Sequence, residues 1–405
     1  MAQTTPLTLH PDRLFPSDPL VRDIARRLYQ QIKDLPIVSP HGHTDPRWFA
    51  DDANFDNATT LLLLPDHYVF RMLYSQGIKL EELGIRRKDG VAVETDYRKI
   101  FHIFAKHYYL FRGTPSRIWL DTVFHDVFGL TQTLCEDTAD HYYDSINAQL
   151  AKPEFKPRAL LERFNIELIA TTEGALNDLK HHAKLKGTGF ETRVITTFRP
   201  DDVVDADRAD FAANVAKLGE ITGEDTQSWQ GYLAALRKRR AVFRDHGATA
   251  TDHGHPTALT ADLPMKEAAA LFQRCLSGKA SKADTELFRG QMLTEMAGMS
   301  LEDGMTMQIH PGAHRNHNKI IFDRFGADKG ADIPSPTEYV QALKPLLQKY
   351  GNEASLNIIL FTLDETTYAR ELAPLAGHYP ALKLGPAWWF HDSPEGMLRF
   401  RHQVT

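Results

Sequence analysis

The sequence predicts an α/β fold with a parallel sheet of the (β/α)₈, TIM-like type. Short apolar runs recur along the chain and alternate with helical patterns. Strands that alternate with helices imply a parallel sheet with right-handed crossovers. Polar and titratable residues follow several of the apolar runs. A (β/α)₈ barrel builds its active site at the C-terminal ends of its strands, so this distribution favours a barrel with a site at one end.

The composition is that of a globular protein, and it excludes several classes of function. Of 405 residues, 42% are hydrophobic and 25% are charged, with a net charge of -6, which gives no support for a nucleic-acid partner. We expect the densest basic run, at 238–240, to lie on a solvated helix face. No apolar run is long enough for a membrane span, and the N-terminus does not resemble a signal peptide. Cys135 and Cys275 do not suggest a disulfide framework, so we expect a cytoplasmic protein.

The N-terminal part, residues 1–49, is predicted to hold one helix and the first strand of the barrel. Asp18 before Pro19 is typical of a helix start. An apolar stripe then recurs every four residues, at Leu20, Ile24, Leu28 and Ile32. The helix is expected to end before Pro36, where a strand leading to His41 begins.

His41 and His43 stand one residue apart where this first strand ends. Residues i and i+2 of a strand point to the same face, so the two imidazoles can bind one metal ion. A catalytic zinc takes about three protein ligands, of which these would supply two. The alternative is a pair of ordinary loop histidines in a chain that has 19 of them, but the position at a strand end favours the metal site.

Residues 50–160 are predicted to form a mainly helical insertion, because apolar and aromatic residues occur there without clean alternation. His67 and Tyr68 lie near its start. An imidazole and a phenol could serve proton transfer at a sugar hydroxyl or carbonyl. Alternatively, Asp66 caps a helix start and Tyr68 packs in a core.

The remainder of the chain, 161–405, supplies the other predicted strands. Six apolar runs are expected to be strands: 166–170, 193–198, 248–251, 305–309, 356–361 and 382–385. With the strand before His41 they make seven, and the eighth strand of a barrel is missing. Residues 397–405 have the pattern of a helix with no strand after it. Seven strands would leave two exposed edges, which closure of a barrel normally removes.

Arg199 and Trp388 are candidate substrate-binding residues at two of these strand ends. A guanidinium can hold a substrate carboxylate through two hydrogen bonds, whereas a salt bridge to Asp201 or Asp202 is the alternative. Trp388 could stack on the apolar face of a sugar, although most tryptophans at such places simply pack.

Asp252 and His310 are candidate catalytic residues at two further strand ends. Asp252, with His253 beside it, offers a base or a hydrogen-bond partner, and an ordinary polar loop is the competing interpretation. His310 could act as a general acid or base or as a further metal ligand, or it could be a hydrogen-bonded core histidine.

Together these residues resemble the uronate isomerase (glucuronate isomerase) family of the amidohydrolase superfamily, from about Leu14 to the end of the chain. The resemblance rests on six motifs in the order of the family: His41-Gly42-His43, Asp66-His67-Tyr68 with Arg71, Thr197-Phe198-Arg199-Pro200-Asp201, Asp252-His253-Gly254, Met307-Gln308-Ile309-His310 with Arg315-Asn316, and Ala387-Trp388-Trp389-Phe390.

The resemblance implies a distorted barrel with a helical insertion after its first strand. It also implies aldose–ketose isomerisation of D-glucuronate to D-fructuronate and of D-galacturonate to D-tagaturonate. By the family pattern, His41 and His43 would bind a divalent ion, expected to be zinc, while His67, Tyr68 and Arg199 would face the substrate. The reaction needs a base at C2, stabilisation of a developing oxyanion and an anchor for the C6 carboxylate, for which we select Arg199.

One departure from the family lies at the C-terminus. Family members continue to an eighth strand with an Asp-Ser-Arg string, whose aspartate completes the metal site, whereas this chain ends at Thr405. If these residues are the whole molecule, we expect an incomplete metal site and little isomerase activity. If they are part of a longer chain, the parent would be the active enzyme.

Two alternatives stay open from the sequence. The first is a metal-dependent hydrolase or deaminase of the same superfamily with another small substrate. The second is a non-catalytic remnant that kept the barrel face. In each case we expect no membrane or nucleic-acid partner, and we expect a homo-oligomer, which could cover exposed strand edges.

Overall fold

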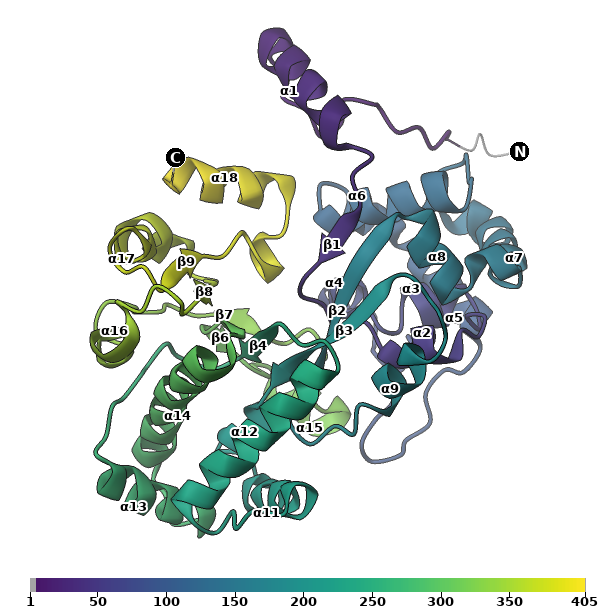
Figure 1. Cartoon of the computed structure of the whole chain (residues 1–405). Coiled ribbons are helices and arrows are strands. Elements are labelled where there is room, and N and C mark those ends of the chain that lie inside the picture. The colour runs from purple at the N-terminus through teal and green to yellow at the C-terminus, as the bar shows by residue number, and fades with distance from the viewer. Residues whose placement is uncertain (1–4, 405) are drawn as a thin grey trace. The chain divides into compact units, whose positions relative to one another are not determined.

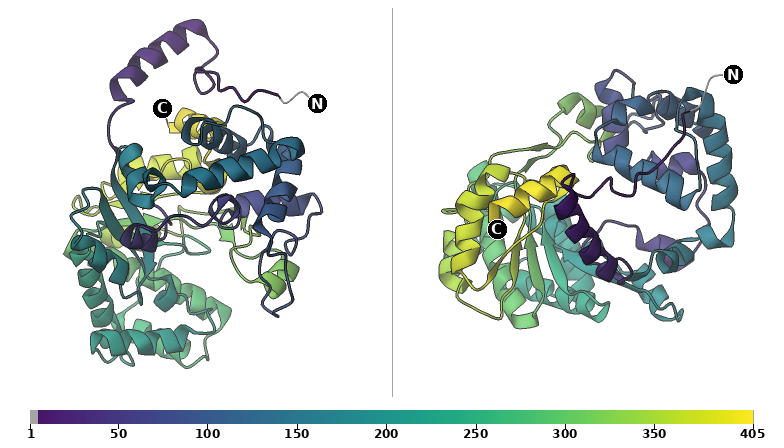
Figure 2. Two further views of the ribbon diagram at one scale, coloured as in Figure 1. Left: turned by 90° about the vertical axis from the view of Figure 1, so that its right-hand side faces the viewer. Right: turned by 90° about the horizontal axis from the view of Figure 1, so that it is seen from above.

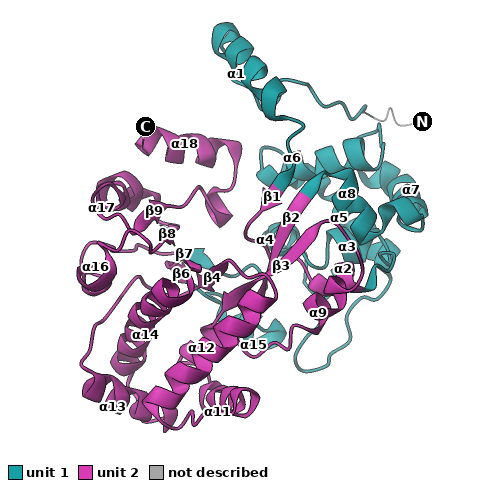
Figure 3. Cartoon of the chain, viewed as in Figure 1, with its two compact units in different colours: residues 1–37, 51–166, 314–333 teal, residues 38–50, 167–313, 334–405 magenta. Residues whose placement is uncertain are grey.

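The computed structural model describes residues 5–404, which belong to two compact units (Figure 3). Each unit is assembled from three separate stretches of chain: unit 1 from 1–37, 51–166 and 314–333, and unit 2 from 38–50, 167–313 and 334–405. Except for the first residue of its first two strands, the large sheet belongs to unit 2. The three domains predicted from the sequence, 1–49, 50–160 and 161–405, group the residues differently from these two units. The three-domain division stays a prediction.

A parallel sheet of seven strands forms the centre of unit 2, in the order β1-β2-β3-β4-β5-β8-β9 (Figure 1). The strands are β1 (Ile37–Ser39), β2 (Ile166–Gly174), β3 (Arg193–Arg199), β4 (Ala250–His253), β5 (Thr306–Ile309), β8 (Ile358–Leu360) and β9 (Leu382–Leu384). These are the seven strands predicted from the sequence. Each pairs with the next in chain order, as in a (β/α)₈ barrel, and β1 and β9 are the two edges among the described residues.

The register of the sheet brings the polar strand ends level with one another. On β4 and β5, Asp252 lies opposite Gln308 and His253 opposite Ile309. On β2 and β3, Gly174 lies opposite Arg199. Because the strands are parallel, the residues that follow them gather at one edge of the sheet.

Helices follow the strands of unit 2, some packing on the sheet and others on neighbouring helices (Figures 1 and 2). They are α2 (Pro46–Asp51), α9 (Lys180–Lys186), α10 (Asp201–Val204), α11 (Phe211–Thr222), α12 (Trp229–Asp245), α13 (Met265–Leu276), α14 (Lys282–Asp303), α16 (Lys344–Tyr350), α17 (Ala373–His378) and α18 (Pro394–Val404). Helix α12 packs against β3, and α14 packs against β5. The alternation predicted from the sequence is confirmed in this unit.

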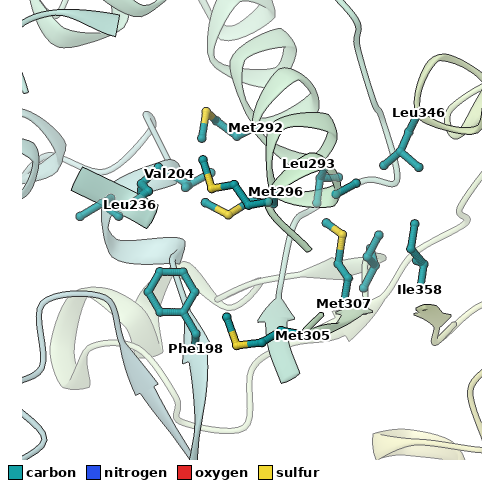
Figure 4. Packing of buried hydrophobic residues seen from close by; sticks show 14 of the residues in the cluster. Phe198, Val204, Leu236, Met292, Leu293, Met296, Met305, Met307, Leu346 and Ile358 are labelled. Carbon is teal, nitrogen blue, oxygen red and sulfur yellow. The ribbon is translucent and has the colours of Figure 1, made fainter. Parts of the chain in front are cut away.

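Methionine side chains fill much of the space between α14 and the sheet (Figure 4). Met292 and Met296 on α14, Met307 on β5 and Phe198 on β3 are all buried in one cluster. The flexible thioether chain of methionine fills irregular gaps in a core. This packing fixes the strands whose ends carry the polar residues described below.

Unit 1 is almost entirely helical, and the helical insertion at 50–160 stays a prediction. Its helices are α1 (Pro19–Ile32), α3 (Ala58–Leu62), α4 (His67–Ser75), α5 (Tyr97–Lys106), α6 (Pro115–Thr122), α7 (Ala139–Leu150), α8 (Pro157–Arg163) and α15 (Lys319–Phe325). Many side chains of its core are aromatic, for example Phe101, Phe104 and Phe124. Ile321 and Phe325, from the distant segment 314–333, complete the same core.

Helix α1 forms as the sequence predicts, but its apolar stripe does not face a core. Asp18 caps the helix by accepting a hydrogen bond from the Val21 amide, and Pro19 is its first residue. No residue of α1 is buried, and Leu20 is 76% exposed. Capping and periodicity suffice to form the helix, and neither depends on what covers its apolar face.

In the basic run at 238–240, Lys238 is exposed but the two arginines are not, so the expected solvated face is wrong for Arg239 and Arg240. Arg239 and Arg240 are buried, and Arg240 is 0% exposed. Arg240 binds both carboxylate oxygens of Asp303, at 2.6 and 2.9 Å, and donates to Ser300 Oγ at 3.0 Å. A planar guanidinium whose donors are satisfied in this way can be buried, which composition alone does not indicate.

A second sheet was not predicted: β6 (Ala313–His314) pairs with β7 (Ile333–Pro334). Two-residue strands are too short to give a periodic signal.

Among the described residues, no helix has the combination of length and apolarity that crossing a bilayer requires. Cys135 and Cys275 are free, in agreement with the absence of a disulfide framework.

Candidate active site

The C-terminal edge of the unit 2 sheet carries a connected group of polar side chains, which begins with the turn after β1. Thr172 Oγ1, on the neighbouring strand β2, donates a hydrogen bond of 2.8 Å to the Gly42 carbonyl. A Cβ on Gly42 would lie 3.1 Å from the Ala170 carbonyl oxygen. Glycine therefore lets the turn lie close against β2, and this contact positions His41 and His43 on either side.

Gln308 on β5 fixes the orientation of His41. Its side-chain oxygen Oε1 lies 2.7 Å from His41 Nδ1. An amide oxygen only accepts hydrogen bonds, so Nδ1 carries the proton and Nε2 keeps its lone pair. A second-shell acceptor of this kind is typical of metal-binding histidines. Gln308 belongs to the motif Met307-Gln308-Ile309-His310 but was not predicted as a site residue, although it stands two residues before His310, a spacing that predicts the same face of the strand.

His43 completes a pair of imidazoles, since its ring centroid lies 5.3 Å from that of His41. Although part of the side chain is exposed, burial of the ring and the neighbouring His41 lower the pKa of His43 to about 4. His43 is therefore neutral near pH 7, the form that binds metals. The two rings supply two of the roughly three ligands that a catalytic zinc takes. Within residues 5–404 no group of three or more His, Cys, Asp or Glu is arranged to hold an ion.

Asp252 lies at the centre of the group, on β4. Its carboxylate is fully buried, with one oxygen bonded to His310 Nε2 and the other 3.2 Å from Arg199 Nη1. Burial alone would raise the pKa of Asp252, but His310 and Arg199 outweigh burial and hold that pKa below its usual range. Asp252 is thus a carboxylate that orients an imidazole on one side and a guanidinium on the other.

His310 follows β5 and connects this carboxylate to the aromatic residues after β9. The His310 ring centroid is 4.8 Å from that of Trp388 and 6.1 Å from that of His41. Because Asp252 accepts from Nε2, the opposite nitrogen Nδ1 of His310 is the proton acceptor. This Nδ1 is buried and has no hydrogen-bond partner in the described part of the chain.

Arg199 ends β3 and is held by a second carboxylate. Its Nε lies 2.7 Å from Asp201 Oδ2, so the salt bridge considered as an alternative exists in addition to the contact with Asp252. Burial would raise the pKa of Asp201, but Arg199 keeps it lowered. Gly254 lies directly beside the guanidinium.

His253, the last residue of β4, faces away from Asp252, and His255 follows the strand. His253 Nε2 is 2.9 Å from Thr251 Oγ1, on the opposite face of the strand from Asp252. Burial lowers the pKa of His253 to about 3 and that of His255 to about 4. Of the predicted pair Asp252 and His253, only Asp252 therefore joins the strand-end group.

His67 and Tyr68 lie in unit 1, at the start of α4. Asp66 caps this helix, and its Oδ1 accepts from the amides of Tyr68 at 2.8 Å and Val69 at 3.3 Å. The helix start considered for these residues is therefore present. Burial lowers the pKa of His67, so this imidazole is neutral at pH 7.

The sheet and its polar edge define a class of protein: an α/β enzyme with its active site at the carboxyl ends of parallel strands. His41, His310, Asp252 and Arg199, four of the predicted site residues, come from four different strand ends and meet in one hydrogen-bonded or ring-contact network. Trp388 joins it through His310.

Comparison with known proteins identifies the family. The model of the glucuronate isomerase family matches residues 17–405, and the chain belongs to this family. A uronate isomerase of Rhizorhabdus wittichii is 64% identical over 400 residues, which are 99% of this chain and 84% of that protein.

Solved structures agree with this assignment. The crystal structure of glucuronate isomerase from Caulobacter crescentus superposes with a TM-score of 0.97 at 60% identity, over 99% of this chain and 83% of that one. A uronate isomerase from Thermotoga maritima gives a TM-score of 0.90 at 27% identity, over 98% and 85% of the two chains. The resemblance noted in the sequence is confirmed, and the chain is an isomerase.

Proposed function

We propose that this chain isomerises uronates, converting D-glucuronate to D-fructuronate and D-galacturonate to D-tagaturonate. The family assignment supports the aldose–ketose class of reaction. The main support from the site is the pair of contacts made by the Asp252 carboxylate. It binds the Arg199 guanidinium, which suits an acidic sugar, and the His310 imidazole, which suits proton transfer.

The reaction moves one proton from C2 to C1 through an enediol, while the carbonyl moves from C1 to C2. In our proposal His310 uses Nδ1 to accept the proton, and Asp252 stabilises the imidazolium that forms. Arg199 binds the C6 carboxylate, and Trp388 packs against the apolar face of the sugar. His67 and Tyr68 are proposed to serve proton transfer at the sugar oxygens.

We propose that His41 and His43 hold a divalent ion, zinc, which would polarise the substrate carbonyl when bound. The neutral imidazoles and the acceptor Gln308 behind His41 support this choice of donors. Elemental analysis of the purified protein tests it. Stoichiometric zinc that is lost in a His41→Ala, His43→Ala double variant is expected, and a protein that binds no divalent ion under zinc saturation contradicts it.

We also propose that the protein is a cytoplasmic homo-oligomer whose substrate is a small uronate, with no nucleic-acid or membrane partner. The mixed surface charge and the two free cysteines support a reducing compartment and no nucleic-acid partner. Light scattering on the purified chain measures the oligomeric state.

Proton NMR of D-glucuronate with the enzyme in D₂O tests the function directly. We expect the ketose signals to appear and deuterium to enter the product. Arg199→Gln should lower kcat/KM by about 100-fold or more, since a charged bidentate contact is lost. Arg208→Gln is the matched control, because Arg208 also pairs with an aspartate two residues later but is exposed to solvent. Hydrolysis of a lactone or amide without isomerisation would overturn the proposal.

A further inference from the structure

Arg199 is held at two points, and a third group limits the space around it. Asp201 Oδ2 accepts from Nε at 2.7 Å, and Asp252 Oδ2 accepts from Nη1 at 3.2 Å. A planar guanidinium that bonds to two different carboxylates through two different nitrogens has its plane and its direction fixed. The side chain therefore does not sample the rotamers open to an ordinary surface arginine.

Gly254 provides the space in which this arrangement fits. A Cβ at Gly254 would lie 2.4 Å from Arg199 Nη2 and 3.1 Å from both Asp201 Oδ2 and His310 Cε1. Heavy atoms do not approach a Cβ as closely as 2.4 Å, so any side chain at this position would displace the guanidinium. The backbone of Gly254 does not adopt a positive φ, hence the glycine is required by this contact and not by the turn.

Asp201 is itself fixed by its place in the fold. It is the first residue of α10, directly after Pro200, and its carbonyl accepts from the Asp205 amide at 3.0 Å. The other end of this four-residue helix is anchored in the core, because Val203 and Val204 are buried and Tyr232 donates to the Val203 carbonyl at 2.8 Å. Because α10 is packed in this way, the Asp201 carboxylate is held in place, and it holds the Arg199 guanidinium in turn.

We propose that Asp201 is a positioning residue, which together with the space at Gly254 sets the orientation in which Arg199 binds the carboxylate of the substrate. This inference rests on the proposed function, in which Arg199 is the anchor for C6. Asp201 and Gly254 then determine the preference for an acidic sugar without touching it. Loss of Asp201 should affect KM for the uronate far more than kcat, since the hydrogen bond between Asp252 and His310 does not involve Asp201.

Three variants separate positioning from simple stabilisation. Asp201→Ala should raise KM by about 10- to 100-fold, as expected for the loss of a charge-assisted hydrogen bond, and should change kcat by less than threefold. Asp201→Asn keeps an oxygen that can accept from Nε and should recover most of this loss. Gly254→Ala should raise KM to at least a similar extent without removing a charge, and it should also lower kcat, because its Cβ would lie 3.1 Å from His310 Cε1 as well as against the Arg199 guanidinium.

The matched control is Asp210→Ala. Asp210 follows Arg208 by two residues and binds it at 2.8 and 2.9 Å, the same spacing as Arg199 and Asp201, but this pair is exposed on the surface. We expect KM of this variant to equal that of the wild type. An Asp201→Ala enzyme with an unchanged KM, or one in which kcat and KM fall together with thermal stability, would overturn the positioning role.

A structural readout keeps this test independent of the proposed function. A crystal structure of the Asp201→Ala variant should show the Arg199 guanidinium in a different rotamer, whether or not the enzyme isomerises uronates. Arg199 unchanged in that structure would refute the positioning role alone. Wild-type enzyme that is inactive on uronates would refute the proposed function alone.

Discussion

Gln308 shows how a residue with no charge can control a site. Its amide oxygen selects the tautomer of His41 that leaves Nε2 able to bind an ion. Gln308→Leu should therefore weaken zinc binding by about 10- to 100-fold, the usual loss when a second-shell partner is removed. Isothermal titration with zinc measures this affinity.

Gln308→Glu is the control, because a carboxylate accepts the same hydrogen bond and should retain or strengthen the affinity. Equal zinc affinities of the wild type and Gln308→Leu would show that the tautomer of His41 is fixed by some other group.

His255 makes the stability of the fold depend on pH. Burial lowers its pKa to about 4 from the ordinary value of 6.5, so the unfolded chain binds more protons between these two pH values. Stability is then complete above pH 6.5 and is lost progressively as the pH falls towards 4. At pH 5 this imidazole alone should cost on the order of 2 kcal/mol relative to pH 7.5.

The measurement is the free energy of unfolding in urea at pH 7.5 and at pH 5. His255→Gln is neutral throughout this range and should show a smaller difference between the two pH values, whatever its absolute stability. A difference as large as that of the wild type would mean that other groups cause the acid sensitivity.

For single residues, the sequence predicts which residues form the site better than it predicts the residues to which they bond. Asp252, His310 and Arg199 could be brought together from strand ends alone, since parallel strands end at one edge. Arg240 could not, because the carboxylate that allows its burial, Asp303, lies 63 residues later in the sequence. From its residue type alone such an arginine is predicted to be exposed. Only its tertiary contacts show that it is buried.

Among the elements, helix α14 contributes many buried residues and packs against β5. Met296, in its middle, is 1% exposed and packs in the cluster around β3 and β5. Met296→Ala should lower the free energy of unfolding by about 2–5 kcal/mol, whereas Met296→Leu should cost less than about 1.5 kcal/mol. Chemical denaturation measures both.

Met265→Ala is the matched control for this prediction. Met265 begins α13 and is 66% exposed, so its truncation should change stability by no more than about 0.5 kcal/mol. Similar losses at Met265 and Met296 would contradict the core described here.

The elements themselves were largely predictable, because their signals are local. The cap Asp18, the proline after it and a four-residue repeat suffice for α1, and short apolar runs suffice for the seven strands, which are three to nine residues long. The pair β6 and β7 is absent from the prediction because two residues per strand contain no period. Whether the apolar face of α1 is buried depends on tertiary contacts, which the periodicity of the sequence does not predict.

For the whole molecule, the main finding is that unit 1 depends on a distant stretch of chain. Phe325, from the segment 314–333, is 7% exposed within the core formed by residues 51–166. Phe325→Ala should destabilise this unit by about 3–5 kcal/mol. Hydrogen exchange followed by mass spectrometry should show faster exchange in α5 and α7, with little change in β4 and β5.

The control lies on the same helix. Phe322 is 38% exposed and contacts Lys88 through its ring, at 5.2 Å from the ammonium nitrogen to the ring centroid. Phe322→Ala should cost less than about 1 kcal/mol. Uniform acceleration of exchange in both units on Phe325→Ala would mean that the molecule opens as a single cooperative body.

The composition of unit 1 could be predicted from the sequence only in part. The helical character of 50–160 follows from its mixed aromatic pattern, but nothing in that stretch reveals that Ile321 and Phe325 belong to its core. Contacts between segments far apart in sequence leave no local signature in either of them.

The interleaving of the two units also sets the order in which a ribosome can complete them. Residues 51–166 leave the exit tunnel early, but their core stays unfinished until 314–333 have been synthesised. At 5–20 residues per second, the roughly 150 intervening residues delay completion by about 10 to 30 s. During this interval the nascent helices expose aromatic surface that a chaperone such as a ribosome-bound holdase could cover, and slow codons within 167–313 would lengthen that exposure.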